Sequence, residues 1–363
     1  MKAAVLRKLN SPIVVEGVDF EGPRDGEVLV RIAATGICHS CYHAVVGTVS
    51  VPRPIILGDE GAGVVEEVGA GVTLVQPGDH VILSWARSCG HCIYCTQGYP
   101  AVCLTASRIK SGHMADGTTR YTSKGKPVYH FGGISSYAEY TVIAEESAIP
   151  IDKDIPLDKA ALVGCSVTTG VCAVTNTAQV RPGSSVAVFG VGGIGLNVVQ
   201  GSVIAGAERI IAIDLVESKL KLAMQFGATH TINAGEADPV SEVYALTDGL
   251  GAEYAFEAIG TKTTYEQTVR AIRSRGKAIW IGAPPREPLS LDASVVFAGE
   301  KMIMGSNYGS ARPRYDMPRL LALYKAGRLK IDELVTRTYQ IEQINEAFDD
   351  MMQGKLARGL IRF

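Results

Sequence analysis

The sequence predicts an α/β protein of two domains, one rich in β-strands and one built on a doubly wound parallel sheet. At 363 residues the chain is too long for one ordinary core. Residues 1–150 contain short β-rich runs broken by proline, glycine and aspartate, which is typical of a mostly antiparallel domain. From about Val180, short apolar strands alternate with amphipathic helices, and this alternation predicts a parallel sheet.

The elements follow from the local pattern of apolar residues. We expect a first strand within MKAAVLRKLN and antiparallel strands at VLVRIAATG, GVVEEVG, HVILSW and AEYTVI. The parallel strands are expected at VAVFG, IIAID, THTIN, YAFEAIG and AIWIG, with helices between them such as ESKLKLAMQFG and TYEQTVRAIRSRG. The tail has helices near MPRLLALYKAGR and IEQINEAFDDMMQG and a closing strand RGLIRF. It does not continue the alternation, so it is compatible with a return to the first domain.

Composition and charge exclude several classes of partner. The chain has 35 Lys+Arg and 37 Asp+Glu, a net charge of −2, and no basic block that would suit nucleic acid or an anionic membrane surface. The N-terminal segment reads as a strand and not as a secretory signal, and no run approaches transmembrane length. We therefore expect a cytoplasmic protein that binds a small-molecule substrate, with no nucleic-acid or membrane partner.

A glycine-rich turn predicts a dinucleotide site. In VAVFGVGGIG, a strand runs into G-x-G-x-x-G and an apolar helix follows. The first glycine permits the tight turn, the second lets a pyrophosphate approach the backbone, and the third lets the helix pack on the strand. The residues of this turn assigned to the cofactor are Gly190, Gly192, Gly193, Ile194 and Gly195.

An acidic residue at the end of the next strand indicates which dinucleotide binds. Asp214 closes IIAID, where a carboxylate accepts hydrogen bonds from the adenosine ribose hydroxyls. It would repel a 2′-phosphate, so the sequence favours NAD(H) over NADP(H). Lys219 is within reach of the same ribose, although a solvated helix lysine is an equally good interpretation.

Four cysteines within a short segment predict a closed metal site. They form C-x2-C-x2-C-x7-C in CGHCIYCTQGYPAVC. Four thiolates can surround one tetrahedral zinc without an open position, which suits a structural site. An iron–sulfur cluster is the main alternative, and disulfides fit a cytosolic chain less well. The residues are Cys89, Cys92, Cys95 and Cys103.

Six motifs together resemble those of the zinc-containing medium-chain alcohol dehydrogenases. GICHS, GDEGAGVVEEVGAGV, PGDHVI, the four-cysteine segment, GCSVTTG and GVGGIG occur in that family's order and spacing, over essentially the whole chain. HMADGTTRYTSKGKPVYHF is similar to a longer loop of the animal, plant and class III-like branch and of related bacterial aryl- or aldehyde-active members. The family implies an oxidoreductase that exchanges hydride between nicotinamide and a small organic substrate.

The resemblance also implies the domain boundaries. It predicts a GroES-like β-barrel catalytic domain over residues 1–166 and 308–363, with a structural-zinc lobe at 89–103, and a Rossmann NAD-binding domain over 167–307. Family members commonly pair through an edge strand of the cofactor domain, so we expect a homodimer.

The catalytic-zinc motif departs from the family pattern at two positions. The family's two cysteine ligands match Cys38 and Cys165, but its ligand histidine, in G-H-E, is replaced by Asp59 in GDE. The family's C-x-x-D also places an aspartate where it orients that histidine, and here that position is Cys41. Because an acid that orients an imidazole is unnecessary without the imidazole, the two changes look coupled.

Three interpretations of this centre remain open. Zinc is bound by Cys38, Asp59 and Cys165, with Asp59 ligating at roughly 2.0–2.2 Å. Alternatively Cys41 or Glu60 joins the ligands, and the added negative charge tightens zinc while weakening it as a Lewis acid. In the third interpretation catalytic zinc is absent, and another acid or a pre-polarised substrate replaces it.

The resemblance assigns further residues around this centre. Ser40 matches the hydroxyl that takes the substrate proton, and His43 matches the histidine that passes it to solvent. His39 and Arg358 match contacts to the cofactor pyrophosphate. Thr169 matches a residue that packs on the nicotinamide face, with Ile194 behind it. The residues matching the substrate pocket are Val49, Trp85 and Phe131.

These assignments predict NAD(H)-dependent interconversion of a hydrophobic alcohol and its aldehyde or ketone, with structural zinc and an atypical catalytic zinc site. One alternative is a zinc-independent reductase of the same family acting on a conjugated alkene or an iminium. A non-catalytic dinucleotide-binding protein is the alternative from another class. Ser40 and His43 count against the last, because a binding module needs no proton path.

Overall fold

The computed structural model describes residues 1–105, 112–284 and 287–363, and these form two compact units. Unit 1 comprises Met1–Ser166, Arg312–Ala326 and Ile331–Phe363, and unit 2 comprises Val167–Ala311 and Gly327–Lys330. Residues 308–311 and 327–330 were expected in the GroES-like domain but belong to unit 2. There the Lys330 backbone N–H donates to Gln200 Oε1 at 2.7 Å, and Ser310 Oγ lies 2.8 Å from Thr177 Oγ1.

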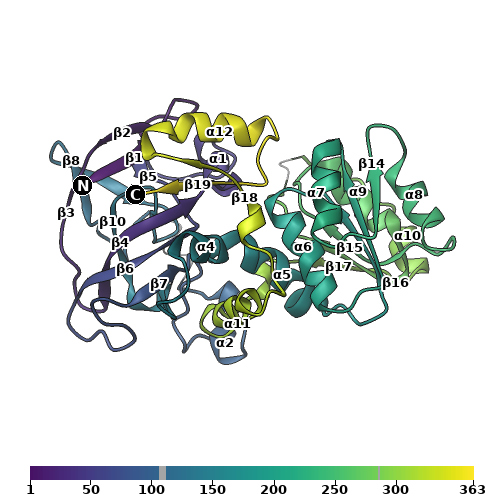
Figure 1. Ribbon diagram of the computed structural model, residues 1–363, viewed down its shortest axis with the longest axis horizontal. Coiled ribbons are helices and arrows are strands. Elements are labelled where there is room, and N and C mark those ends of the chain that lie inside the picture. Colours follow the sequence, from purple (N-terminus) through teal and green to yellow (C-terminus); the bar gives the residue numbers. More distant parts are fainter. Residues whose placement is uncertain (106–111, 285–286) are drawn as a thin grey trace. The chain divides into compact units, whose positions relative to one another are not determined.

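Unit 1 is a mostly antiparallel β structure, as the short strand runs predict (Figure 1). One of its sheets has the order β2-β1-β5-β9-β8-β3, and another runs β11-β7-β6-β4-β19-β18 with β10 also paired to β4. The strands are β1 Lys2–Leu6, β2 Val14–Gly17, β3 Asp19–Phe20, β4 Glu27–Gly36, β5 Ile55–Ile56, β6 Gly61–Val68, β7 His80–Leu83, β8 Tyr121–Ser123, β9 Lys126–His130, β10 Tyr140–Ala144, β11 Ala148–Ile151, β18 Val335–Tyr339 and β19 Arg358–Arg362.

Most helices of unit 1 are short. The described helices are α1 His39–Val46, α2 Ile93–Thr96, η1 Pro100–Val102, η2 Glu145–Ser147, α4 Leu157–Leu162, α11 Pro313–Lys325, η6 Asp332–Leu334, η7 Ile341–Gln343 and α12 Ile344–Met352, and α11 is the longest of them. The tail returns to this unit as the sequence suggested, because β19 pairs antiparallel with β4 through Leu360 and Gly36.

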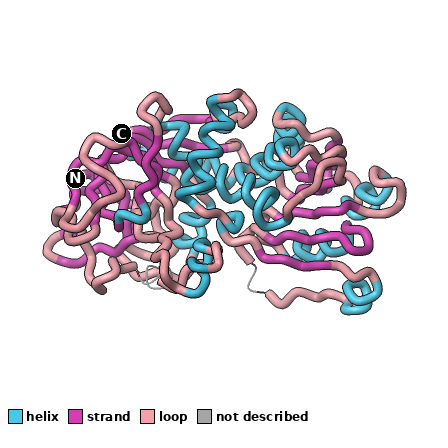
Figure 2. The backbone as a smooth tube through the Cα atoms, turned by 90° about the horizontal axis from the view of Figure 1, so that it is seen from below, coloured by secondary structure: helices cyan, strands magenta, loops and turns pink. Residues whose placement is uncertain are grey.

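Unit 2 is a parallel sheet with helical connections, and Figure 2 shows its strands and helices alternating along the chain. The strand order β14-β13-β12-β15-β16-β17 reverses direction beside β12, which places a ligand crevice at the carboxyl ends of the central strands. Its strands are β12 Ser185–Phe189, β13 Arg209–Asp214, β14 His230–Asn233, β15 Ala252–Glu257, β16 Ile272–Trp280 and β17 Met302–Gly305.

Helices connect these strands. Helix α6 packs on β12 and β13, α7 on β13 and β14, and α9 on β15 and β16. The helices are α5 Thr168–Cys172, η4 Ala173–Ala178, α6 Gly193–Ile204, α7 Glu217–Gln225, α8 Pro239–Ala245, α9 Lys262–Ala271, α10 Ala293–Ala298 and η5 Tyr308–Ser310. The predicted helix TYEQTVRAIRSRG is wrong in its second half, because α9 ends at Ala271 and Ile272 pairs with Ala252 at the start of β16.

One apolar helical run, Leu157–Ala178, is long enough to cross a membrane by length and composition, contrary to the expectation that no run approaches that length. It contains α4, α5 and two π-helical turns, Val163–Val167 and Ala173–Ala178. Since 83% of its most apolar window is buried inside the protein, it has the character of a core helix.

Candidate active site

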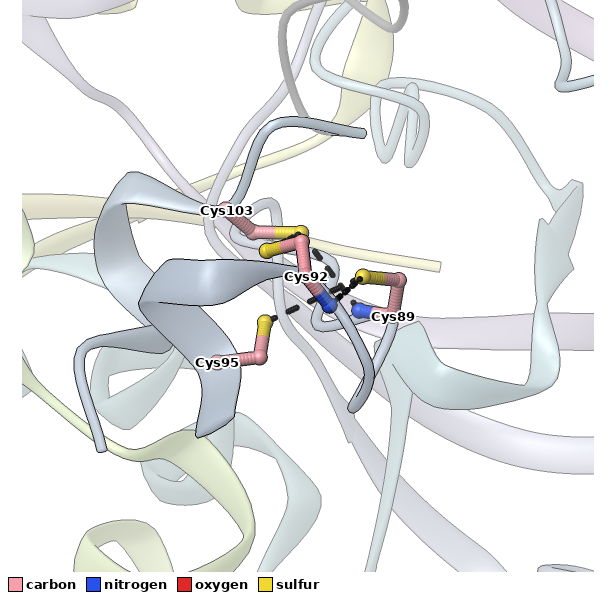
Figure 3. Close-up of side chains that lie close together, drawn as sticks. All are labelled: Cys89, Cys92, Cys95 and Cys103. Carbon is pink, nitrogen blue, oxygen red and sulfur yellow. Dashed lines mark hydrogen bonds between the residues drawn. The ribbon is translucent and has the colours of Figure 1, made fainter. Parts of the chain in front are cut away.

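The four clustered cysteines form a closed tetrahedral donor set in unit 1 (Figure 3). The Sγ atoms of Cys89 and Cys95 are 4.0 Å apart, and those of Cys92 and Cys103 are 3.9 Å apart. A zinc ion with Zn–S bonds of about 2.3 Å in tetrahedral geometry needs Sγ atoms about 3.8 Å apart. The cysteines are free of disulfides and therefore fit a structural metal.

Backbone and side-chain donors prepare this site for thiolates. The backbone N–H of Cys92 donates to Cys89 Sγ at 3.4 Å, and that of Cys89 donates to Cys103 Sγ at 3.5 Å. Hydrogen bonds from Thr105, from the His91 backbone and from Cys92 lower the pKa of Cys89 to about 5. A thiolate stabilised in this way is the form that binds a metal.

A second donor set lies in the core of unit 1. Cys38 precedes α1, Asp59 follows β5, and Cys165 lies on the π-helical turn Val163–Val167. One donor atom from each lies within 4.8 Å of the other two. Cys38 Sγ and Cys165 Sγ are 4.0 Å apart, and Cys165 Sγ is 4.0 Å from Asp59 Oδ2. Three ligands at this spacing fit a tetrahedral zinc that keeps its fourth position open.

Local backbone features hold these three side chains in place. Gly58 has φ +102°, and a Cβ there would lie 2.6 Å from the backbone nitrogen of Tyr137, so only glycine fits beside Asp59. The Tyr137 hydroxyl accepts from the Cys38 backbone N–H at 3.4 Å and donates to Gly36 O at 3.2 Å. The π-turn around Cys165 is a helix irregularity often found at functional sites.

The chemistry of the three donors calls for a cation. Cys38, Asp59 and Cys165 are only 2%, 4% and 4% exposed. The hydrogen bond between the Cys38 and Cys165 thiols lowers the pKa of Cys38 to about 6 and raises the pKa of Cys165. Burial raises the pKa of Asp59 well above its ordinary value. The raised pKa values show that the ionised forms of Asp59 and Cys165 are costly in this environment unless they coordinate a metal. A divalent cation would satisfy all three.

Cys41 and Glu60 lie beside this donor set without belonging to it. Cys41 Sγ accepts from the Gly58 backbone N–H at 3.3 Å and lies 3.5 Å from Asp59 Oδ1. Burial raises the pKa of the Cys41 thiol well above its ordinary value. Glu60 Oε1 instead accepts from the Ser166 backbone N–H at 2.7 Å. The geometry thus supports the interpretation with three ligands.

Arg358 contributes a buried positive charge to the same region. It is 4% exposed, its Nη1 donates to Ile37 O at 3.0 Å, and its Nε lies 3.8 Å from Glu60 Oε2. Burial alone would lower the pKa of Arg358, but the neighbouring charges of Glu60 and Cys38 raise it. Its predicted contact with the cofactor pyrophosphate stays a prediction.

The predicted proton-transfer residues share α1. Ser40 Oγ is 3.5 Å from Cys38 Sγ, and His43 is half-buried in the last turn of the helix. Residues three apart lie on the same face of a helix. Burial lowers the pKa of His43, which keeps its imidazole neutral and able to accept a proton. His39, the first residue of α1, is exposed.

The predicted pocket residues lie at different depths. Trp85 and Phe131 are partly buried against the apolar cluster that contains Cys38 and Cys165. Val49 is 39% exposed, and its backbone N–H donates to His43 O at 3.0 Å just beyond α1. The structure therefore gathers two aromatic side chains near the donor set.

The glycine turn of unit 2 leaves room for a dinucleotide. Gly190 has φ +86°, and a Cβ on Gly195 would lie 1.8 Å from Gly190 O, which explains the need for glycine at both positions. At Gly192, which precedes α6, a Cβ would meet nothing within 4 Å. Open space beside the first N–H groups of a helix is where a pyrophosphate binds.

Other cofactor residues of unit 2 are arranged around this turn. Asp214 Oδ2 accepts from the Val191 backbone N–H at 3.0 Å, so the carboxylate lies at the turn. Lys219 is half-buried on α7. Thr169 is next to Gly170, where a Cβ would lie 2.6 Å from Ile194 O, so α5 and α6 pack closely there. Gly193 is the first residue of α6. The positions of Asp214, Lys219 and Thr169 are compatible with bound NAD(H).

Comparisons with known proteins agree with this arrangement. Residues 24–153 match the alcohol dehydrogenase GroES-like domain, and residues 193–326 match the zinc-binding dehydrogenase family. An NDMA-dependent alcohol dehydrogenase from Amycolatopsis methanolica is 40% identical over 99% of this chain and 98% of its own length. The chain belongs to the zinc-binding medium-chain alcohol dehydrogenase family. It is an oxidoreductase of this family, whose members bind zinc and typically use NAD(H).

Two further relatives extend the comparison. An S-(hydroxymethyl)glutathione dehydrogenase from Synechocystis sp. is 40% identical over 100% of this chain and 99% of its own. The benzyl alcohol dehydrogenase structure from Acinetobacter calcoaceticus has a TM-score of 0.95 at 35% identity, covering 100% of this chain and 99% of that one. The GroES-like and Rossmann-type architecture predicted from the sequence is thereby confirmed.

Two residues that lie against Cys38 and Glu60 escaped the sequence analysis. Tyr137 positions Cys38 by accepting a hydrogen bond from its backbone N–H. Gly36 makes room for Glu60, because a Cβ on Gly36 would lie 2.0 Å from Glu60 Oε2. Tyr137 is separated from Cys38 by 99 residues, so no local pattern links them. The only available signal for Gly36 was its position at the end of a strand, two residues before Cys38.

Proposed function

We propose that this chain interconverts a hydrophobic alcohol and its aldehyde or ketone with NAD(H), using a catalytic zinc held by Cys38, Asp59 and Cys165. The observation that carries the proposal is the spacing of these three buried donors. Three protein ligands would leave the fourth position of a tetrahedral zinc for the substrate. Zinc and NAD(H), when bound, supply a Lewis acid that makes the substrate hydroxyl more acidic and an acceptor or donor of hydride. The four-cysteine lobe holds a second, structural zinc.

The chain's own residues bind substrate and move the proton. Trp85 and Phe131 provide apolar surface for an aromatic or long-chain alcohol, and Val49 narrows the entrance. Ser40 accepts the hydroxyl proton, and neutral His43, three residues along α1, conveys it to solvent. The similar proteins include a benzyl alcohol dehydrogenase and an S-(hydroxymethyl)glutathione dehydrogenase, so benzyl alcohol is the first substrate to test.

Cofactor choice and cellular context belong to the same proposal. The Asp214 carboxylate at the glycine turn repels a 2′-phosphate, which favours NAD(H) over NADP(H). His39 and Arg358 contact the cofactor pyrophosphate, Thr169 and Ile194 support the nicotinamide, and Lys219 approaches the ribose. The protein acts in the cytoplasm as a homodimer.

An Asp59→Ala substitution tests the proposal. We expect two zinc ions per wild-type chain and one in the variant, measured by mass spectrometry of the metal content. The kcat/KM for benzyl alcohol with NAD should fall at least roughly 1,000-fold, since a catalytic metal supplies several kcal/mol of stabilisation. Asp349→Ala, at an exposed position of α12, is the matched control and should keep both properties. One zinc per wild-type chain with unchanged turnover in Asp59→Ala would overturn the proposal.

A further inference from the structure

The contact between Cys41 and Asp59 has a definite hydrogen-bond direction. Cys41 Sγ is 3.5 Å from Asp59 Oδ1, and both side chains are buried, at 0% and 4% exposure. Cys41 Sγ is the donor in this contact, and a metal-bound carboxylate, which has only acceptors, would accept it. The sulfur also accepts from the Gly58 backbone N–H at 3.3 Å, so the Gly58 contact leaves the S–H proton for Asp59.

The same carboxylate faces the metal donors with its other oxygen. Asp59 Oδ2 lies 4.0 Å from Cys165 Sγ, whereas Oδ1 is the atom that meets Cys41. The two oxygens therefore have separate partners. A donor on Oδ1 fixes the rotation of the carboxylate and leaves Oδ2 for the metal.

This pair reverses the polarity of the family's pattern. A ligand histidine presents an N–H outward, and an aspartate at the position of Cys41 would accept it. Here the ligand presents an acceptor and the neighbour presents a donor. Each half of the pair therefore fits its own partner best. Two carboxylates at positions 41 and 59 would face each other with acceptors only, and a histidine N–H beside Cys41 would meet a thiol that is only a weak acceptor.

We infer that Cys41 is a positioning residue whose thiol donates to Asp59 Oδ1 and holds Oδ2 ready for zinc. Positions 41 and 59 thus act together, with the donor at 41 and the acceptor at 59, the reverse of the family's pair. The inference rests on the proposed function, because it takes the centre at Asp59 to bind zinc. It concerns metal affinity, which is measured without turnover.

A set of variants at the two positions tests the inference. Zinc affinity is measured by competition with a chromophoric chelator, and cobalt(II) substitution reports the geometry through its visible absorption. Cys41→Ala should weaken the Asp59 site by about 10- to 100-fold, the usual effect of losing such a hydrogen bond. Cys41→Ser keeps a donor and should restore most of the affinity and the wild-type cobalt spectrum.

The double substitution provides the sharper comparison. Cys41→Asp and Asp59→His alone should each weaken zinc binding, whereas the double variant, with acceptor and donor exchanged, should bind zinc more tightly than either single variant. The zinc of the four-cysteine lobe is an internal reference, and circular dichroism identifies any variant that fails to fold.

Each outcome bears on a different claim. Additive losses in the double variant, or unchanged affinity in Cys41→Ala while the wild type holds two zinc ions, would overturn the inference and leave the proposed function intact. A wild-type chain that holds only the structural zinc would overturn both.

Discussion

Ser40 and His43 set the expected pH dependence of the reaction. Burial lowers the pKa of His43 below its ordinary value of 6.5, so the imidazole is neutral at pH 7 and becomes protonated only in more acidic solution. A protonated imidazole cannot accept the substrate proton. The rate of alcohol oxidation should therefore fall as the pH drops through the lowered pKa of His43.

His43→Gln removes this acceptor. We expect kcat/KM for oxidation to fall roughly 100-fold near neutral pH, a typical contribution of general base catalysis. A pH profile of the oxidation rate is recorded from about 5 to 9, a range that includes the reference pKa of histidine. The decrease in rate at acidic pH, which we assign to protonation of His43, should be absent from the profile of the variant. His230→Gln, on β14 of unit 2, is the control. An identical profile in wild type and His43→Gln would exclude His43 from the proton path.

At the residue scale, the sequence identified donors better than it identified their surroundings. Cys38, Asp59 and Cys165 followed from motifs, and the structure brings their donor atoms together. The contact of Arg358 with Glu60 joins residues far apart in the chain, so no local pattern could indicate it. Whether Cys41 or Glu60 contacts a metal-donor side chain also depends on side-chain rotation, and the spacing of residues in the sequence does not determine that rotation.

At the scale of elements, two glycines of the turn between β12 and α6 are needed for different reasons, one for packing and one for cofactor binding. A Cβ on Gly195 would overlap Gly190 O, whereas a Cβ on Gly192 would enter open space. Gly195→Ala should therefore destabilise unit 2 by about 1–3 kcal/mol, as overpacking does, and lower its melting temperature. The measurement is thermal unfolding without cofactor.

Gly192→Ala is the counterpart for binding. It should leave thermal unfolding unchanged but raise the Kd for NADH roughly tenfold, or about 1.4 kcal/mol, because the methyl group occupies space assigned to the pyrophosphate. NADH fluorescence titration measures this. Equal NADH affinity in Gly192→Ala and wild type would contradict the placement of the pyrophosphate at this turn.

The same scale shows where pattern-based prediction fails. Helix α9 and strand β16 are adjacent in sequence, and the arginine-rich run Ile272–Gly276 continues the helical pattern of the preceding residues. Pairing of Ile272 with Ala252 overrides that pattern, because a strand gains backbone hydrogen bonds that no local periodicity records. The π-turn at Cys165 was likewise outside the expected helix and strand alternation.

For the whole molecule, the metal donors and the glycine turn assigned to the dinucleotide fall in separate units. Both cysteine-containing donor sets lie in unit 1, whereas Gly190, Gly192 and Asp214 lie in unit 2. Cys103→Ser should reduce zinc from two ions to one and lower the melting temperature, since structural zinc contributes folding energy. NADH binding, measured by fluorescence, should persist.

Cys172→Ala provides the matched comparison. Cys172 is a buried cysteine of unit 2 that forms no disulfide and lies outside both donor sets of the described residues, so its replacement should keep two zinc ions. Loss of zinc from Cys172→Ala, or full zinc content in Cys103→Ser, would contradict the assignment of the four-cysteine lobe.

The central claim concerns the metal at Asp59, and one measurement tests it most directly. A crystal structure with anomalous diffraction recorded on both sides of the zinc absorption edge locates each zinc ion. The account predicts two peaks per chain, one among the four lobe cysteines and one bounded by Cys38 Sγ, Asp59 Oδ2 and Cys165 Sγ. A single peak in the lobe, with none at Asp59 in protein that oxidises alcohols, would contradict it.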